Sequence, residues 1–242
     1  MNVKAAFFDL DDTLCDDYQA WVSCSRKAAR LAAEHNGAID TDRLAETFLG
    51  ISESYWTSPE ALREVRPLFE VRTGQWREAL RTAGYPPSNE LAERICETYG
   101  LLRSTEVALF PDAVPTLEEL RRRGVKLALI TNGWQSTHVQ KVESLGLEPH
   151  FDHVLIAGEL GFFKPETRIF EHALNLCGCE ASEAVMIGDD IVNDVGGAEA
   201  AGIVSIWFNP KNKPLRPGLP VPSGGQIRAL SEVLDSAYLT GA

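Results

Sequence analysis

Five short apolar runs recur along the chain, and the last four alternate with segments that have helical periodicity. Short apolar runs separated by helices are typical of buried parallel strands. The runs lie at residues 4–9, 125–131, 153–158, 184–188 and 203–208. The helical segments lie at 112–123, 135–145, 166–177 and 194–201. The alternation predicts an open α/β sheet, in which ligands bind beyond the carboxyl ends of the strands.

A long region without strands separates the first apolar run from the second. In it, two sets of apolar side chains each fall on one face of a helix. They are Tyr18, Trp21, Val22, Ala29 and Ala32, and then Leu91, Ile95, Tyr99 and Leu102. This pattern predicts a helical bundle at 16–107, inserted into a core made of 1–15 and 108–242. Near the C-terminus, the residues at 209–225 are rich in Pro and Gly and predict a surface loop before a last helix at about 227–238.

Composition limits the class of partner. The chain has 35 acidic and 23 basic side chains, a formal charge of -12, and no basic run, which argues against nucleic acid as a partner. The N-terminus reaches acidic residues after one short apolar run, so we expect no signal peptide and no membrane span. The five cysteines lack the paired spacing of a zinc site or a disulfide framework. These features predict a cytoplasmic protein with reduced thiols.

Carboxylates gather after two of the predicted strands. Asp9 and Asp11 follow the first run directly, and such a pair repels unless a cation binds or one group takes a proton. Taken alone, this pair also fits a solvated turn. Asp189, Asp190 and Asp194 follow the fourth run and enter a helical segment. The macrodipole at a helix N-terminus explains one acid there but not three. Hard oxygen ligands in this number favour Mg²⁺.

Two further segments at strand ends carry groups suited to an anion. Thr131 ends the second run and offers a hydroxyl, and the backbone N–H groups that follow it, from Asn132 on, lead into a helical stretch and can face an anion. Lys164 stands directly before Pro165, a residue suited to the first turn of a helix. By themselves, these segments fit a plain strand-to-helix turn and an exposed loop lysine better than an anion site.

The four segments together resemble the signature motifs of the haloacid dehalogenase superfamily. They are DLDDT at 9–13, ITNG at 130–133, FFKPETRIF at 162–170 and IGDDIVNDVGGAEAAG at 187–202. They look most similar to those of the nucleotidases and N-acylneuraminate-9-phosphate phosphatases within that superfamily. The resemblance implies a Rossmann-like parallel-sheet core with an inserted helical cap. It also implies an Mg²⁺-dependent phosphatase that hydrolyses a small phosphomonoester, of the nucleoside or sugar monophosphate type, through an aspartyl-phosphate.

The resemblance also implies a role for each matched residue. Asp9 matches the nucleophile and Asp11 the general acid and base. Asp189 matches the carboxylate that holds Mg²⁺ together with Asp9 and the backbone carbonyl of Asp11. Thr131, the backbone at Asn132 and Lys164 match the groups that bind the phosphoryl oxygens.

Other residues around these motifs are less closely matched. Asp194 is expected one layer out from the metal, where it would orient Lys164 or a metal-bound water. The family often has Ser or Thr in place of Asp190, which leaves open whether Asp190 joins the metal ligands. It often has Gly in place of Asp12, a position that Asp can occupy because it tolerates left-handed backbone.

Two other functions remain open at this level. A 2-haloacid dehalogenase would use the same nucleophile, but the dehalogenases of this superfamily lack the second aspartate that Asp11 matches. A catalytically inactive binding protein would keep only the fold. The five histidines, His138 among them, match none of the motif positions and are expected at the surface or in packing. In the cap, four side chains offer aromatic faces and a cation for selecting substrates, although each one taken singly fits packing of the helical bundle better: Tyr55, Trp56, Arg72 and Trp76. The sequence sets neither the natural substrate nor the oligomeric state.

Overall fold

The computed structural model describes residues 3–35, 37–56, 58 and 66–239. The chain forms two compact units, one made of Met1–Asp16 and Ala108–Ala242 and the other of Asp17–Val107. In the described residues, the first is an α/β unit and the second is helical. No helix in this part of the chain combines the length and the apolar character that crossing a membrane requires.

The α/β unit is built on one six-stranded parallel sheet, which confirms the predicted fold class. The strands lie in the order β3-β2-β1-β4-β5-β6. They are β1 (Ala5–Phe8), β2 (Lys126–Thr131), β3 (His153–Ile156), β4 (Ala184–Gly188), β5 (Val204–Phe208) and β6 (Gln226–Ile227). Every residue of β1 is buried, because this strand lies in the middle of the sheet and both of its faces are covered. This explains why the run is apolar throughout instead of alternating.

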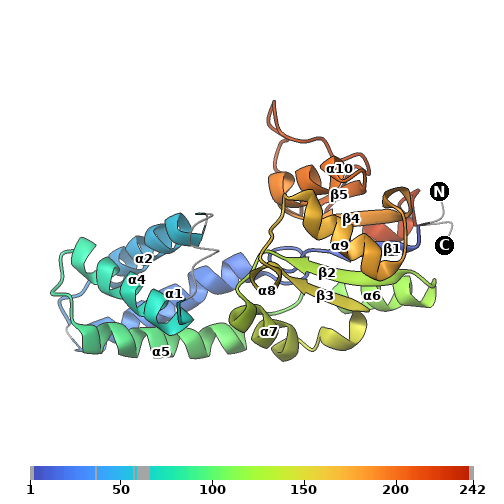
Figure 1. The fold of residues 1–242 in the computed structure, drawn as a ribbon. Helices are drawn as coiled ribbons and strands as arrows, with labels where there is room; N and C mark the ends of the chain where they lie inside the picture. The colour runs from blue at the N-terminus through green and yellow to red at the C-terminus, as the bar shows by residue number, and fades with distance from the viewer. Residues whose placement is uncertain (1–2, 36, 57, 59–65, 240–242) are drawn as a thin grey trace. The chain divides into compact units, whose positions relative to one another are not determined.

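Helices alternate with the strands, and four of the five α-helices described in this unit lie within segments predicted to be helical, whereas Ala157–Leu160 was not predicted (Figure 1). They are α6 (Ala113–Arg122), α7 (Gln135–Ser144), α8 (Ala157–Leu160), α9 (Thr167–Cys177) and α10 (Gly197–Ala200), with short 3-10 helices at Glu148–His150 and Ala181–Glu183. Both α6 and α9 pack against β2. In α9 the buried residues recur at helical spacing: Ile169, Phe170, Ala173, Leu174 and Cys177. Such a stripe is what a helix covering a sheet requires.

The C-terminal region differs from its prediction. In place of one helix at about 227–238, the chain adds the short edge strand β6 and then a 3-10 helix at Leu230–Asp235. Leu230 and Val233 are the buried residues of that helix, and their spacing of three matches three residues per turn. Two paired residues are too few to show a strand pattern in the sequence.

The helix predicted at 194–201 begins earlier and is irregular. A π-helical turn covers Ile191–Gly196 and is followed by α10. Asp190 starts this turn, because its side chain accepts hydrogen bonds from the backbone N–H groups of Val192 and Asn193.

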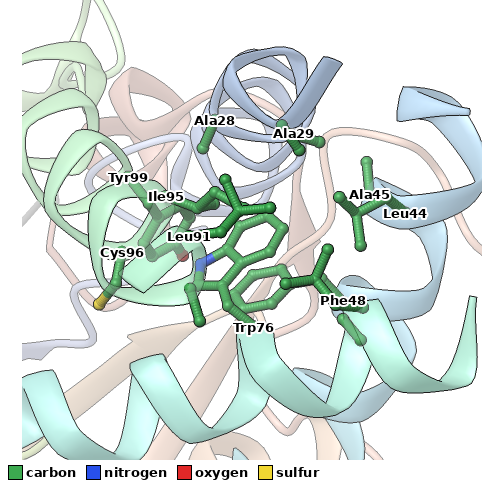
Figure 2. Packing of buried hydrophobic residues seen from close by; sticks show 14 of the residues in the cluster. Ala28, Ala29, Leu44, Ala45, Phe48, Trp76, Leu91, Ile95, Cys96 and Tyr99 are labelled. Atoms are coloured by element: carbon green, nitrogen blue, oxygen red, sulfur yellow. The ribbon is translucent and has the colours of Figure 1, made fainter. Parts of the chain in front are cut away.

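The helical unit contains α1 (Asp17–His35), α2 (Thr41–Trp56), α4 (Leu68–Thr82) and α5 (Asn89–Glu106). Its core is centred on Trp76 and Phe48, whose rings stack with centroids 3.7 Å apart and an angle of 7° (Figure 2). Small residues of α1 line the same core, among them Ala28 and Ala29. The apolar face predicted for α1 is wrong at its first residue, because Tyr18 is 47% exposed instead of packed in the bundle.

Candidate active site

Three neighbouring strands bring polar residues of three motifs together at one edge of the sheet. Since β1 lies between β2 and β4, Asp9, Thr131 and Asp189 lie at adjacent carboxyl ends of the sheet. The backbone N–H of Asp9 donates to the carbonyl of Ile187 at 3.0 Å, which continues the pairing of β1 with β4 beyond the strand. Carboxylate oxygens of Asp9, Asp189 and Asp194 all lie within 4.8 Å of one another. The structure thus joins two sequence segments that are separated by about 180 residues.

Lys164 supplies the positive charge of this cluster. Its ammonium donates to Asp9 at 2.7 Å, to Asp194 at 2.6 Å and to the carbonyl of Ile130 at 2.8 Å. The side chain is only 2% exposed. Burial alone would lower the pKa of Lys164, but the two carboxylates raise it above its ordinary value. Lys164 is therefore a fixed, fully charged donor and not an exposed loop residue.

Asn132 holds Lys164 in place. The side-chain amide of Asn132 donates to the Lys164 carbonyl, and its oxygen accepts from the Lys164 N–H, both at 2.8 Å. Sequence reasoning singled out only the backbone of Asn132 and missed this side-chain role. The two bonds fix the segment that carries the lysine against the end of β2.

The carboxylates outnumber the cation. Burial raises the pKa of Asp9 to about 7, although Lys164 opposes the shift. Burial and the charge of Asp9 raise the pKa of Asp189 to about 9, and burial raises that of Asp194. Three carboxylates against one ammonium leave an excess of negative charge, and no described residue donates a hydrogen bond to the Asp189 carboxylate. A divalent cation with a preference for oxygen ligands fits this donor set.

Asp190 and Asp194 have different partners. Asp194 is 1% exposed and binds Lys164, while its second oxygen accepts from the N–H of Asp190 at 3.0 Å. A Cβ at Gly188 would lie 2.2 Å from an Asp194 oxygen, so only glycine fits there. Asp190 uses its oxygens on the N–H groups of its own turn and on the Asn193 amide. Its carboxylate thus maintains the local fold.

Asp11 has two basic partners that the sequence did not indicate. One oxygen lies 2.6 Å from the ammonium of Lys141, and the other lies 3.0 Å from Nε2 of His138. Burial alone would raise the pKa of Asp11, but these two neighbours lower it below its ordinary value. The expectation for His138 was incomplete, because the buried ring also contacts a motif carboxylate. The spacing of three between His138 and Lys141, on a helix that starts just after the ITNG segment, is the signal that could have found them.

Comparison with known proteins follows the same lines. A model of the haloacid dehalogenase-like hydrolase family matches residues 3–202. The chain belongs to this family. It is 41% identical over 232 residues to the phosphoserine phosphatase of Thermus thermophilus, covering 89% of this chain and 92% of that one. It is 30% identical over 236 residues to the N-acylneuraminate-9-phosphatase of Mus musculus, covering 91% and 88%. These findings confirm the resemblance seen in the motifs.

A dehalogenase is among the similar structures of this family. The crystal structure of a 2-haloacid dehalogenase from Pseudomonas syringae pv. Tomato DC3000 has a TM-score of 0.67 and 31% identity, and the match covers 99% of each chain. Fold and overall similarity therefore do not distinguish phosphatases from dehalogenases within the family. The side chains at the ends of the strands must make the distinction.

Proposed function

We propose that this chain hydrolyses a small phosphomonoester, with Asp9 as the nucleophile. The observation that carries the proposal is the pair of carboxylates after β1. Asp9 is bound to Lys164 in the cluster that it forms with Asp189 and Asp194. Asp11 is bound separately to His138 and Lys141. A reaction that expels an alkoxide needs both a nucleophile and a proton carrier, whereas halide expulsion needs no proton. The chain is a phosphoric monoester hydrolase, as its curated relatives are by name.

The reaction is proposed to proceed in two displacements. A carboxylate oxygen of Asp9 attacks phosphorus, the bond from phosphorus to the ester oxygen breaks, and protonated Asp11 gives its proton to the leaving oxygen. Water then loses a proton to Asp11 and attacks phosphorus, which releases inorganic phosphate and restores the Asp9 carboxylate. Lys141 and His138 favour the ionised form of Asp11 that this second step requires. Substrates whose leaving oxygen needs little protonation should therefore react fastest.

The surrounding groups stabilise the charge that develops on the phosphoryl oxygens. Lys164, the Thr131 hydroxyl and the backbone N–H at Asn132 are proposed to bind these oxygens. Mg²⁺ would be held by the carboxylates of Asp9 and Asp189 with the backbone carbonyl of Asp11. When bound, it supplies positive charge that balances the three carboxylates of the cluster.

The chain's five cysteines, all described, form no disulfide, which favours a reducing compartment such as the cytoplasm.

Phosphate release tests this function directly. The purified protein should release inorganic phosphate from p-nitrophenyl phosphate with Mg²⁺, and excess EDTA should reduce the rate by at least about 100-fold. Mg²⁺ should also raise the melting temperature, because the ion binds the folded state. Incubation with 2-chloropropionate should yield no chloride. Chloride release without a metal would instead favour a dehalogenase, and neither product would favour an inactive binding protein.

Choice among substrates is proposed to depend on the helical unit, acting as a cap. Of the four residues singled out there, Trp76 is fully buried against Phe48 and cannot stack on a ligand without repacking. Tyr55 and Trp56 contact each other edge to face. Arg72 lies over the ring of Tyr99, with its guanidinium 5.2 Å from the centroid. Arg72 is therefore the side chain whose charge is best suited to a polar leaving group.

Substitution of Arg72 tests the cap proposal. Arg72→Met should lower kcat/KM for phosphoserine or a sugar phosphate by about 10-fold or more, and should affect p-nitrophenyl phosphate much less. Arg77→Met is the matched control, since Arg77 lies on the same helix and binds Asn89 at an exposed site. An equal loss for all substrates would show that Arg72 only stabilises the helical unit.

A further inference from the structure

We propose that Lys141 and His138 are positioning residues that hold the Asp11 carboxylate in place for proton transfer. The inference rests on the proposed phosphatase function. Neither residue lies in the four motifs, and both belong to α7. They act through Asp11 and not on the substrate itself.

The two contacts reach both oxygens of one carboxylate. Lys141 meets Oδ1 at 2.6 Å and His138 Nε2 meets Oδ2 at 3.0 Å. Residues three apart on a helix share a face, so α7 presents the two donors as a pair. The side chains of Lys141 and His138 are 8% and 11% exposed, whereas that of Asp11 is 33% exposed. Two buried side chains thus hold a carboxylate that is itself only partly exposed.

The ring of His138 is itself held by the backbone. A Cβ at Gly133 would lie 2.0 Å from ring atoms of His138, so the ring occupies the space that a side chain at 133 would need. The Gly133 carbonyl accepts from the N–H of Gly158 at 3.0 Å, and a Cβ at Gly158 would lie 2.6 Å from that carbonyl oxygen. These two glycines let the start of α7 approach α8, the short helix directly after β3, closely. The ring of His138 is therefore packed closely against the backbone at Gly133.

The charges of the site divide into two sets. Lys164 binds Asp9 and Asp194, while Lys141 and His138 bind Asp11. Asp11 stands directly before Asp12, whose φ of 61° places the chain in a left-handed turn. A short carboxylate on such a turn has several rotamers, and proton transfer requires one that is within hydrogen-bond reach of the reacting oxygen. The pair on α7 selects one orientation of Asp11 and separates it from the nucleophile cluster.

Leaving-group dependence provides the test. In Lys141→Met, kcat/KM for an alkyl phosphomonoester such as glycerol 2-phosphate should fall about 10- to 100-fold, the loss that misplacing a catalytic group produces. The loss for p-nitrophenyl phosphate should be markedly smaller, because its leaving group needs little protonation. Lys141→Arg should restore part of the difference. His138→Ala should show the same selectivity and serves as the second variant if Lys141→Met fails to fold.

A double-mutant cycle separates positioning from simple stability. Asp11→Asn should show the same selective loss, and adding Lys141→Met to it should change kcat/KM little further, since the two residues act as one unit. Lys126→Met, which removes a lysine bonded to the Cys177 carbonyl, is the matched control and should leave the ratio of the two substrates unchanged. Uniform or additive losses for Lys141→Met, or a gain with the alkyl ester, would overturn the inference. Inactivity of the wild-type protein on both esters would instead overturn the proposed function.

Discussion

Asp9→Asn should reduce kcat by at least about 10⁴-fold, because the substitution removes the proposed nucleophile while it keeps the shape of the side chain. The variant should nevertheless remain folded. Burial raises the pKa of Asp9 to about 7, so ionising this side chain destabilises the folded state, and the full cost is present above about pH 7. A neutral amide removes this unfavourable charge. In EDTA, we therefore expect a melting temperature no lower than that of the wild type.

The covalent step can be observed directly. Rapid acid quenching during turnover should trap phosphate on the peptide that contains Asp9 in the wild type and none in Asp9→Asn, as measured by mass spectrometry. Asp12→Asn is the matched control, since Asn also tolerates the left-handed backbone at this position and should keep most of the turnover. Near wild-type kcat in Asp9→Asn would exclude a covalent mechanism through this residue.

The sequence predicts the sheet well because the strands that build the site are buried on both faces. The apolar runs at residues 4–9, 125–131 and 184–188 contain β1, β2 and β4, and their polar ends meet because these strands are neighbours in space. The edge strand β6 leaves no such signal, since it is two residues long and only Ile227 is buried. The ends of these strands were therefore predictable, because burial on both faces requires apolar side chains up to the point where the strand ends.

The partners of Asp11 could not be predicted in the same way. His138 and Lys141 lie on α7, and their spacing of three places them on one face of that helix without indicating what the face meets. Their role depends on Asp11 lying across from that helix, about 130 residues earlier in the chain. The same holds for the side chain of Asn132, whose contact with Lys164 exists only in the folded sheet. Contacts between segments distant in the sequence require the structure.

Lys164→Met should greatly lower both the stability of the protein and its turnover. The substitution leaves Asp9 and Asp194 buried without their cation, and breaking a buried ion pair from one side costs about 3–5 kcal/mol. We expect a loss of this size in the free energy of unfolding, measured by urea titration in EDTA. Turnover should fall by about 10³-fold or more, since a fixed charge at the phosphoryl group is removed. Lys164→Arg should not recover either property, because the side chain is 2% exposed and the larger guanidinium has no room.

Substituting Asp194, the partner of Lys164, shows whether Lys164→Met acts by leaving a buried charge unpaired or by removing packing. Asp194→Asn combined with Lys164→Met should be less destabilised than the sum of the two single variants, because the double variant no longer buries Asp194 as an unpaired charge. Addition of Mg²⁺ should restore part of the stability of Lys164→Met, since a bound cation neutralises Asp9 and Asp189 but not the deeper Asp194. Lys126→Met should unfold like the wild type. Additive losses, with no response to Mg²⁺, would show that Lys164 stabilises the unit by packing alone and that the carboxylate cluster does not bind a divalent ion.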